Sequence, residues 1–326
     1  MDVRAMARWT KCLLILVLLS ACAAAFARTP VVLSTDIGNE IDDQWAIAYL
    51  LLNPNFQVLG LISAHAPSIP DPSGYNSYLL LRDEVENRLH MTTHPPILPG
   101  SDLPLQNATT PRMNDAVHFL AETSQSYSEK HRLTVLVTGA ATDVASAILA
   151  DPSIANRIRI VAMGFKNESD GEEYNVQNDV AAWQAILNSN VPVVIGPGDV
   201  CARDLAMHFD QAKRMLAEDG PIGSWLWKEY DDWYFRNVKP LRKDDFSKPW
   251  VIWDIITVAY LEGMTTQEQK PRPQLADDSS VHSRTTTSTV TWITSVDSGR
   301  LWTSFQGRMR DYLRTHSVPD GGCGSR

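Results

Sequence analysis

Residues 31–52 read VVLSTDIGNEIDDQWAIAYLLL, and this stretch decides the fold. It begins with the apolar, strand-like run Val31–Leu33, passes through a polar loop, and continues as a helix-like segment over Asp42–Leu52. The same alternation of short apolar runs and amphipathic stretches continues to about residue 195. Strands that are regularly separated by helices imply a mostly parallel sheet covered on both faces. The sequence therefore predicts an α/β fold, with an open, mostly parallel sheet flanked by helices, in a single domain.

The elements expected after residue 52 follow from the same two patterns. Strands are predicted at Val58–Ile62, Pro96–Leu98, Leu133–Val137, Ile158–Met163 and Val191–Ile195. Helices are predicted at Tyr75–Leu89, Ala116–Ser128, Asp143–Leu149 and Ala181–Leu187. The last third is less regular: we expect a hairpin from Thr287–Thr294 and Leu301–Phe305, a helix at Met309–Arg314, and core packing for the aromatic-rich segment Ser224–Phe235.

The composition is that of a globular protein. The 326-residue chain has a net charge of −9, with 44% hydrophobic and 21% charged residues. An acidic balance, without a basic run interleaved with aromatics, argues against a protein that follows the phosphates of DNA or RNA. We therefore expect no nucleic acid polymer as a partner.

The first 27 residues have the pattern of a secretory leader. Three basic residues precede an apolar stretch, Cys12–Ala27, that is too short to serve comfortably as a stable anchor. Cleavage after the A-x-A site Ala25–Ala27 would leave residues 28–326 as the mature domain. Alternatively, Leu19–Cys22 resembles a bacterial lipobox, in which Cys22 carries a lipid anchor. Both alternatives predict an exported protein, either periplasmic or secreted.

Disulfide bonds are not expected to determine this fold. Two of the four cysteines lie in the predicted leader, so the mature part keeps only Cys201 and Cys323. An oxidising compartment would permit these two to pair, but one pair is not a disulfide framework.

The loop after the first predicted strand gathers four carboxylates within eight residues: Asp36, Glu40, Asp42 and Asp43. Ligands of open parallel sheets bind beyond the carboxyl ends of the strands, where this loop lies. Clustered carboxylates would repel one another without a cation, and oxygen ligands suit a hard ion such as Ca²⁺. The alternative is that Asp42 and Asp43 simply cap the following helix. The position of Asp36 at a strand end, followed by the flexible Gly38, favours a binding site.

Five motifs follow one another in the chain between Val31 and Asp254. They are Asp36-x-Gly38 with Asp42-Asp43; the P-x-x-x-G-x-x-x-P-L segment Pro96–Leu105; the turn Thr138–Ala145; Asn167 with Glu173-Tyr174-Asn175, Asp179 and Ala182; and Trp253-Asp254. In this order the motifs resemble those of the inosine/uridine nucleoside hydrolase family. Each motif alone is weak, but five in register are specific.

The resemblance implies calcium-dependent hydrolysis of the N-glycosidic bond of ribonucleosides, giving ribose and a free base. It implies that Ca²⁺ is held by Asp36, Asp43, Asp254 and the backbone carbonyl of Thr138, with Asp36 also taking a proton from water. It assigns the sugar to Asp42, Asn167, Glu173 and Asn175, and stacking of a purine base to Trp253. The partner would be a small-molecule nucleoside, and the sequence is compatible with a homo-oligomer.

Three departures from the family pattern stand beside this resemblance. The loop between Asp36 and Asp42 is two residues longer than the compact D-x-G-x-D-D form. Residues 63–68 lack the glycine-asparagine pair that usually touches the ribose, and Trp253 replaces a histidine that protonates the leaving base in one branch. The first two departures motivate an alternative function, a non-catalytic nucleoside- or carbohydrate-binding protein on the same fold. The intact calcium set favours the enzyme.

Several of these residues also have a plain structural interpretation. Thr142 is expected to cap the helix that follows it. Asn175 and Asp179 are residues that commonly satisfy backbone groups of a loop.

Overall fold

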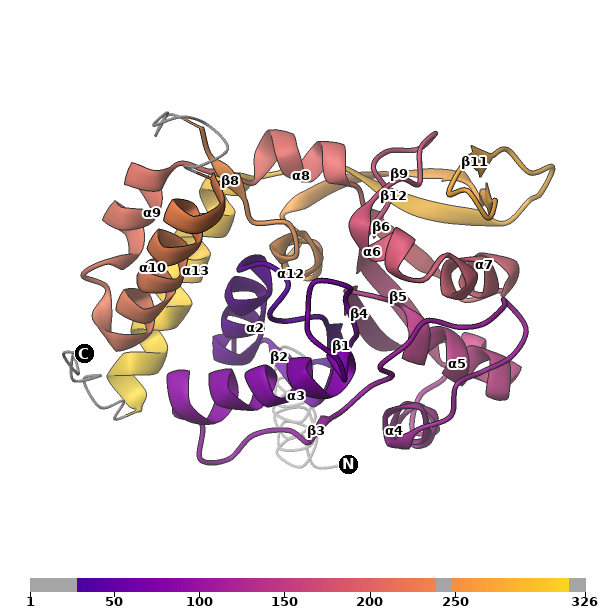
Figure 1. The fold of residues 1–326 in the computed structure, drawn as a ribbon, viewed down its shortest axis with the longest axis horizontal. Helices are drawn as coiled ribbons and strands as arrows, with labels where there is room; N and C mark the ends of the chain where they lie inside the picture. The colour runs from indigo at the N-terminus through magenta and orange to yellow at the C-terminus, as the bar shows by residue number, and fades with distance from the viewer. Residues whose placement is uncertain (1–27, 239–247, 317–326) are drawn as a thin grey trace, which may run out of the picture.

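Strand β1 (Thr29–Thr35) lies inside an eight-stranded sheet in the computed structural model, which describes residues 28–238 and 248–316 (Figure 1). The strand order is β3-β2-β1-β4-β5-β6-β12-β9. The other strands are β2 (Phe56–Ser63), β3 (Ile97–Leu98), β4 (Leu133–Thr138), β5 (Ile158–Met163), β6 (Val193–Gly196), β9 (Thr265–Pro271) and β12 (Thr289–Val296). All neighbours pair in parallel except β12 and β9, which are antiparallel at one edge. The predicted mostly parallel α/β sheet is confirmed.

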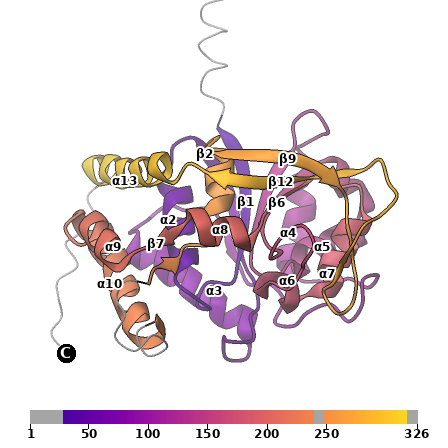
Figure 2. The same cartoon turned by 90° about the horizontal axis from the view of Figure 1, so that it is seen from above.

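Helices cover both faces of the sheet, as Figures 1 and 2 show. One face carries α2 (Asp42–Leu52), α3 (Ser73–Asp83), α9 (Phe209–Leu216), α10 (Gly220–Trp233), α12 (Ile255–Leu261) and α13 (Ser298–Thr315). The other carries α4 (Asp115–Ser124), α5 (Thr142–Ala150) and α7 (Val180–Asn188). The shorter elements are η1 (Glu84–Arg88), η2 (Pro152–Asn156), α6 (Tyr174–Asn178), α8 (Gly198–Asp204), η3 (Tyr234–Val238), β7 (Ala206–Met207), β8 (Trp250–Val251), β10 (Gln274–Leu275) and β11 (Val281–His282).

Helix α2 has the predicted bounds and is apolar almost all round because it is buried on several sides. Trp45 stacks on Phe305 of α13 with ring centroids 5.7 Å apart. The alternative that Asp42 and Asp43 cap this helix is wrong, because the residue at the cap is Ile41 and no side chain caps the first turn. Asp43 instead accepts a hydrogen bond from the hydroxyl of Thr35, at the end of β1. The two aspartates are thus free of a capping role.

The hairpin predicted from Thr287–Thr294 and Leu301–Phe305 is wrong. Strand β12 lies between β6 and β9, and the second segment is the beginning of α13. The carboxylate of Asp297 accepts a hydrogen bond from the backbone N–H of Arg300 and so caps that helix. Leu301, Phe305 and Met309 are all buried, and their four-residue spacing places them on one face of a helix. The predicted final helix, Met309–Arg314, is the last part of the same α13.

The predicted helix Tyr75–Leu89 is divided. It runs as α3 to Asp83 and then as the π-helical turn η1. The aromatic-rich segment packs in the core as predicted, with Tyr230 and Tyr234 fully buried.

Predictions at both ends of the chain lie outside the described residues. They are the leader and the lipid anchor at Cys22 near the N-terminus, and the pairing of Cys323 near the C-terminus. Cys201 lies inside them and is buried. Among residues 28–238 and 248–316, no helix has both the length and the apolar character needed to cross a membrane.

Candidate active site

A pocket of about 420 Å³ opens at the carboxyl edge of the sheet. Asp36 directly follows β1, Met163 ends β5, and Gly198 begins the helix after β6; all three line the pocket. The fold therefore brings strand ends that are far apart in the sequence to one place, as expected for an open parallel sheet. The remaining lining residues are Asn39, Glu40, Asp42, Asp43, Lys166, Glu172, Glu173, Tyr174, Asn175, Asp199, Ala202, Trp253 and Asp254.

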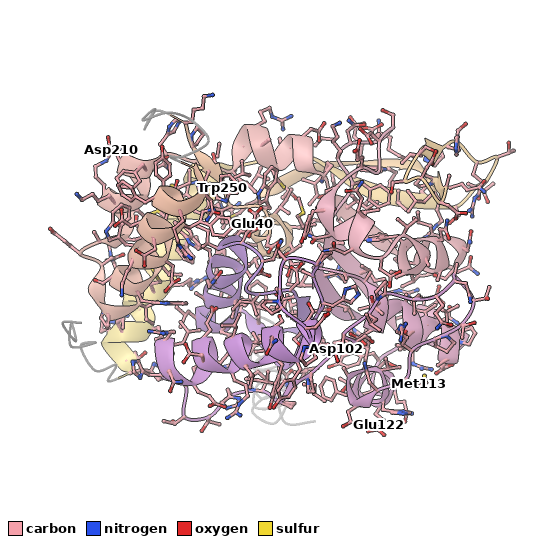
Figure 3. All side chains as sticks on the ribbon, in the orientation of Figure 1. Glu40, Asp102, Met113, Glu122, Asp210 and Trp250 are labelled. Atoms are coloured by element: carbon pink, nitrogen blue, oxygen red, sulfur yellow. The ribbon has the colours of Figure 1, made fainter. Side chains whose placement is uncertain are left out.

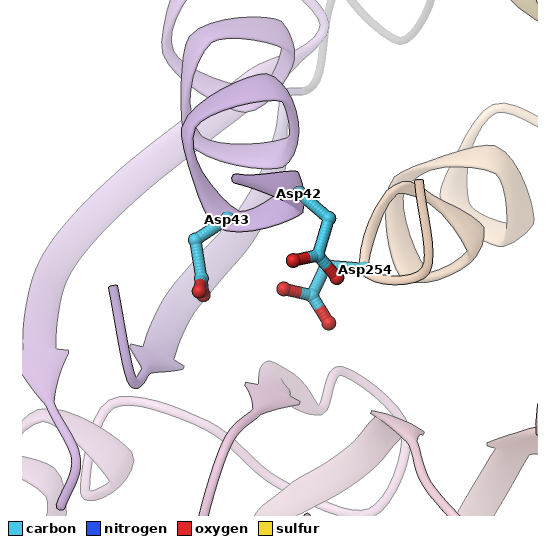
Figure 4. Close-up of side chains that lie close together, drawn as sticks. All are labelled: Asp42, Asp43 and Asp254. Atoms are coloured by element: carbon cyan, nitrogen blue, oxygen red, sulfur yellow. The ribbon is translucent and has the colours of Figure 1, made fainter. Parts of the chain in front are cut away.

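Three aspartates converge in this pocket (Figure 4). Carboxylate oxygens of Asp42, Asp43 and Asp254 all lie within 4.8 Å of one another, and all three residues are buried. Asp42 and Asp43 come from the first turn of α2, while Asp254 precedes α12. The predicted calcium set contained Asp36 rather than Asp42 beside the other two. Asp36 lines the same pocket, and its Oδ2 is buried without a hydrogen-bond partner in the described structure.

Burial raises the pKa of each of these aspartates, and repulsion from neighbouring carboxylates raises it further for Asp36, Asp43 and Asp254. For Asp36 the larger cause is burial and the next is the charge of Asp43, and for Asp43 it is burial followed by the charge of Asp42. Burial also raises the pKa of Asp254 far above its usual range, and that of Asp42 to about 6. No cationic side chain is among the main influences on these four pKa values.

Buried carboxylates without a cationic partner fit a metal site. Keeping them ionised in an apolar surrounding is unfavourable unless positive charge is added. A donor set made only of oxygen atoms suits a hard divalent cation. The residues present therefore fit the metal that the family uses, on their chemistry and on the unpartnered oxygen of Asp36.

Strand β4 lies directly against Asp36. Thr138 pairs in register with Thr35 at the ends of β4 and β1, and it is fully buried. The next residue, Gly139, approaches so closely that a Cβ there would lie 2.9 Å from the backbone nitrogen of Asp36. The structure thus brings the end of β4, with Thr138, beside Asp36.

Glu173 and Asn175 line the pocket as predicted. The Glu173 carboxylate caps α6, accepting hydrogen bonds from the backbone N–H of Asn175 (3.0 Å) and of Val176 (3.1 Å). Burial is the main cause that raises the pKa of Glu173 to about 7. Asn175 Nδ2 lies 3.5 Å from the carbonyl oxygen of Met163. These contacts hold two polar side chains at the edge of the pocket.

Asn167 is not brought to the pocket. Its Oδ1 accepts hydrogen bonds from the backbone N–H and the hydroxyl of Ser169, each 2.9 Å long. Asparagine commonly forms such local bonds to residues two positions further on, which compete with a role in binding. The structure therefore gives this predicted sugar ligand a turn-forming contact instead.

Thr142 and Asp179 were both expected to satisfy backbone groups. Thr142 does not cap α5; its hydroxyl donates to Asp179 at 2.6 Å and lies 2.9 Å from His65 Nε2. The carboxylate of Asp179 satisfies backbone groups as expected. It accepts hydrogen bonds from the backbone N–H of Leu105 in a loop and of Ala182 in α7, each 2.8 Å long. This network joins α5, the start of α7 and two loops.

Glu40 and Lys166 line the pocket but were given no role by the sequence motifs. Lys166 is exposed and pairs with Asp170 at 2.9 Å. Burial, followed by the charge of Asp42, raises the pKa of Glu40 to about 8. The membership of Glu40 in the acidic loop was the signal that could have marked it.

Comparison with known proteins places this site in a family. Residues 31–303 match the profile described as "Inosine-uridine preferring nucleoside hydrolase". Pyrimidine-specific ribonucleoside hydrolase RihA of Escherichia coli O9:H4 (strain HS) is 27% identical over 270 residues, which cover 74% of this chain and 82% of that protein. A purine-preferring ribonucleoside hydrolase from Gardnerella vaginalis has a solved structure with a TM-score of 0.65 at 18% identity, covering 88% of this chain and 100% of its own. The plant nucleoside hydrolase PpNRh1 gives a TM-score of 0.67 at 15% identity, covering 87% of this chain and 99% of its own.

Proposed function

The chain belongs to the inosine-uridine preferring nucleoside hydrolase family, and on that premise we propose that it hydrolyses ribonucleosides with Ca²⁺ held by its pocket aspartates. Family membership makes it a hydrolase that acts on N-glycosyl compounds, cleaving the bond between ribose and base. The observation that carries the calcium proposal is the group of buried aspartates at the carboxyl edge of the sheet, with no cation among the main influences on their pKa values.

Asp36, Asp43 and Asp254, with the carbonyl of Thr138, are the proposed ligands, and Asp42 lies close enough to join them or to bind the sugar diol. Ca²⁺, when bound, would orient a water molecule and the ribose hydroxyls and offset the carboxylate charge. Asp36 would accept the proton of the attacking water, and its unpartnered Oδ2 supports this role. Glu173 and Asn175 would position the sugar, and the surrounding carboxylates would stabilise positive charge that develops on the ribosyl ring.

The test is ribose release from a panel of inosine, guanosine, uridine and cytidine with Ca²⁺ saturating. The free base is measured by chromatography and the ribose by its reducing end. We expect equal amounts of the two products, and no release from Asp43→Asn. Binding of a nucleoside without any ribose release by the wild-type chain would contradict the proposal.

We also propose that the protein is exported, to the periplasm or the outside of the cell. The support is the sequence of residues 1–27, whose basic start, short apolar stretch and small residues match a leader. Determining the N-terminus of the mature protein tests this. A start at Arg28 would indicate cleavage after Ala27, an acylated Cys22 would indicate a lipid anchor, and an intact Met1 in the cytoplasm would contradict export.

A further inference from the structure

The loop between Asp36 and Asp42 carries an acidic residue on the pocket wall that the proposed mechanism does not use. This residue is Glu40, which lines the pocket and lies in a loop that is two residues longer than the compact family form. Figure 3 labels Glu40 above α2 with Trp250 next to it. Glu40 thus lines the same pocket as the aspartates.

One carboxylate oxygen of Glu40 has no partner. Oε2 is buried and forms no hydrogen bond with any residue in the ranges that the structure describes. Leaving a buried polar atom unpaired is unfavourable, so such an atom facing a pocket marks a place where a ligand atom can bind.

Two indole rings stand beside this carboxylate. Trp250 Nε1, like Glu40 Oε2, is buried without a hydrogen-bond partner among the described residues, and both indoles lie near enough to Glu40 to influence the pKa of its carboxylate. Trp253 lines the pocket and directly precedes Asp254 of the aspartate cluster. Flat aromatic surfaces with one hydrogen-bonding group are suited to a planar heterocycle, whereas the crowded carboxylates around Asp42 suit a sugar diol.

We propose that Glu40 is the residue that contacts the leaving base, forming a hydrogen bond with a ring or exocyclic N–H or with a ring nitrogen. This assignment rests on the proposed nucleoside hydrolysis and deepens it: Glu40 and Trp253 together form the base end of the pocket. Nucleosides whose base offers a hydrogen-bonding edge are therefore the substrate class that gains most from this residue.

The test separates the base from the sugar by comparing inosine and uridine with 4-nitrophenyl riboside, which has no nucleobase. Variants Glu40→Ala and Glu40→Gln are assayed with Ca²⁺ saturating. Glu122→Gln on the exposed face of α4 is the control. We expect Glu40→Ala to lower kcat/KM for the nucleosides about 10- to 100-fold, the effect of losing one hydrogen bond, and to change the nitrophenyl substrate less than about threefold. Calcium binding and the melting temperature should match those of the wild type.

The Gln variant shows what Glu40 contributes. If Glu40→Gln keeps most of the nucleoside activity, a hydrogen bond from an uncharged group is sufficient. If it loses as much as Glu40→Ala while the nitrophenyl substrate is spared, the contact with the base requires a carboxyl group. Both results place Glu40 at the base.

Two results would overturn the assignment. One is an equal loss on all substrates, which means that Glu40 acts on the metal or the sugar, and the other is no loss on any. If instead the wild-type chain releases no ribose from either substrate class, the proposed function itself fails and the Glu40 assignment fails with it.

Discussion

At the scale of single residues, the site depends on carboxylates that the fold buries without an opposite charge. Asp36 is the sharpest case, because it is 2% exposed and one of its oxygens has no partner. An asparagine there would keep the shape and one oxygen ligand but could not take up a proton. We therefore expect aspartate and asparagine at position 36 to differ in catalysis although their shapes are the same.

Asp36→Asn is expected to lower kcat about 10²- to 10⁴-fold, the usual contribution of a general base. The measurement is turnover of inosine and of 4-nitrophenyl riboside with Ca²⁺ saturating, so that weaker metal binding does not account for the loss. Glu122→Gln serves as the control and should match the wild type. Near-native turnover of Asp36→Asn on the nitrophenyl substrate would show that Asp36 is not the base.

Glu84 gives a prediction about pH that does not involve catalysis. Both of its carboxylate oxygens are buried without a partner in the described structure, and burial raises the pKa of Glu84 far above 4.5. The folded state therefore holds a proton that the unfolded state has lost, so the free energy of unfolding falls as pH rises above 4.5. Glu84→Gln removes this penalty, and its melting temperature should exceed that of the wild type by more at pH 8 than at pH 5. A pH-independent difference would contradict this account.

At the scale of elements, strand ends and helix starts set the geometry of the pocket. The approach of β4 to β1 is one close contact of this kind, because Gly139, directly after β4, packs against the backbone of Asp36. A side chain at this position would have to displace backbone rather than a flexible group. The position of Asp36 thus depends on Gly139, which has no side chain, at the end of the neighbouring strand.

Gly139→Ala should lower the free energy of unfolding by about 1–3 kcal/mol through overpacking. Activity should fall on the order of 10²-fold, because a small displacement of a catalytic group has effects of that size. Gly307→Ala in α13 is the matched control, since a Cβ there meets no atom within 4 Å. This control should be stabilised by about 0.5–1 kcal/mol. Native activity in Gly139→Ala would contradict the packing argument.

The start of α13 allows a prediction on stability alone. Asp297→Ala removes the carboxylate that caps the helix through Arg300 N at 3.1 Å. Loss of such a cap costs about 0.5–2 kcal/mol of stability. Chemical denaturation should show this loss while kcat/KM stays unchanged, because α13 does not line the pocket. A loss of activity with unchanged stability would contradict the separation of these roles.

How far the elements follow from the sequence depends on whether the signal is local. The bounds of α2 were predicted correctly because an acidic turn and a continuous apolar run mark its start and length. The hairpin prediction failed because Asp297-Ser298-Gly299 fits both a turn and a helix start, and the pairing of β12 with β6 is a long-range contact. Asn167 stayed out of the pocket because its local bonds to Ser169 satisfy it. The proximity of Glu40 to Trp250 and Trp253 could not be predicted, since it brings together segments that are more than 200 residues apart in the sequence.

At the scale of the whole molecule, the architecture explains why one pocket collects residues from distant parts of the chain. Parallel strands end at a common edge, and helices on both faces bury the sheet below that edge (Figure 2). Asp36 and Asp254 are more than 200 residues apart in the sequence and still share the pocket. The metal would therefore join elements that are far apart in sequence, and its removal should affect stability as well as catalysis.

The most direct test of the central claim removes and restores calcium in one experiment. The protein is treated with EGTA, dialysed against calcium-free buffer, and titrated with Ca²⁺ while ribose release from inosine and the melting temperature are both followed. We expect both to return along the same concentration curve, with a gain of about 4 °C at a hundredfold excess over Kd, and neither to return in Asp254→Asn. Unchanged activity and melting temperature in the metal-free protein, or recovery with another divalent ion but not with Ca²⁺, would contradict the account.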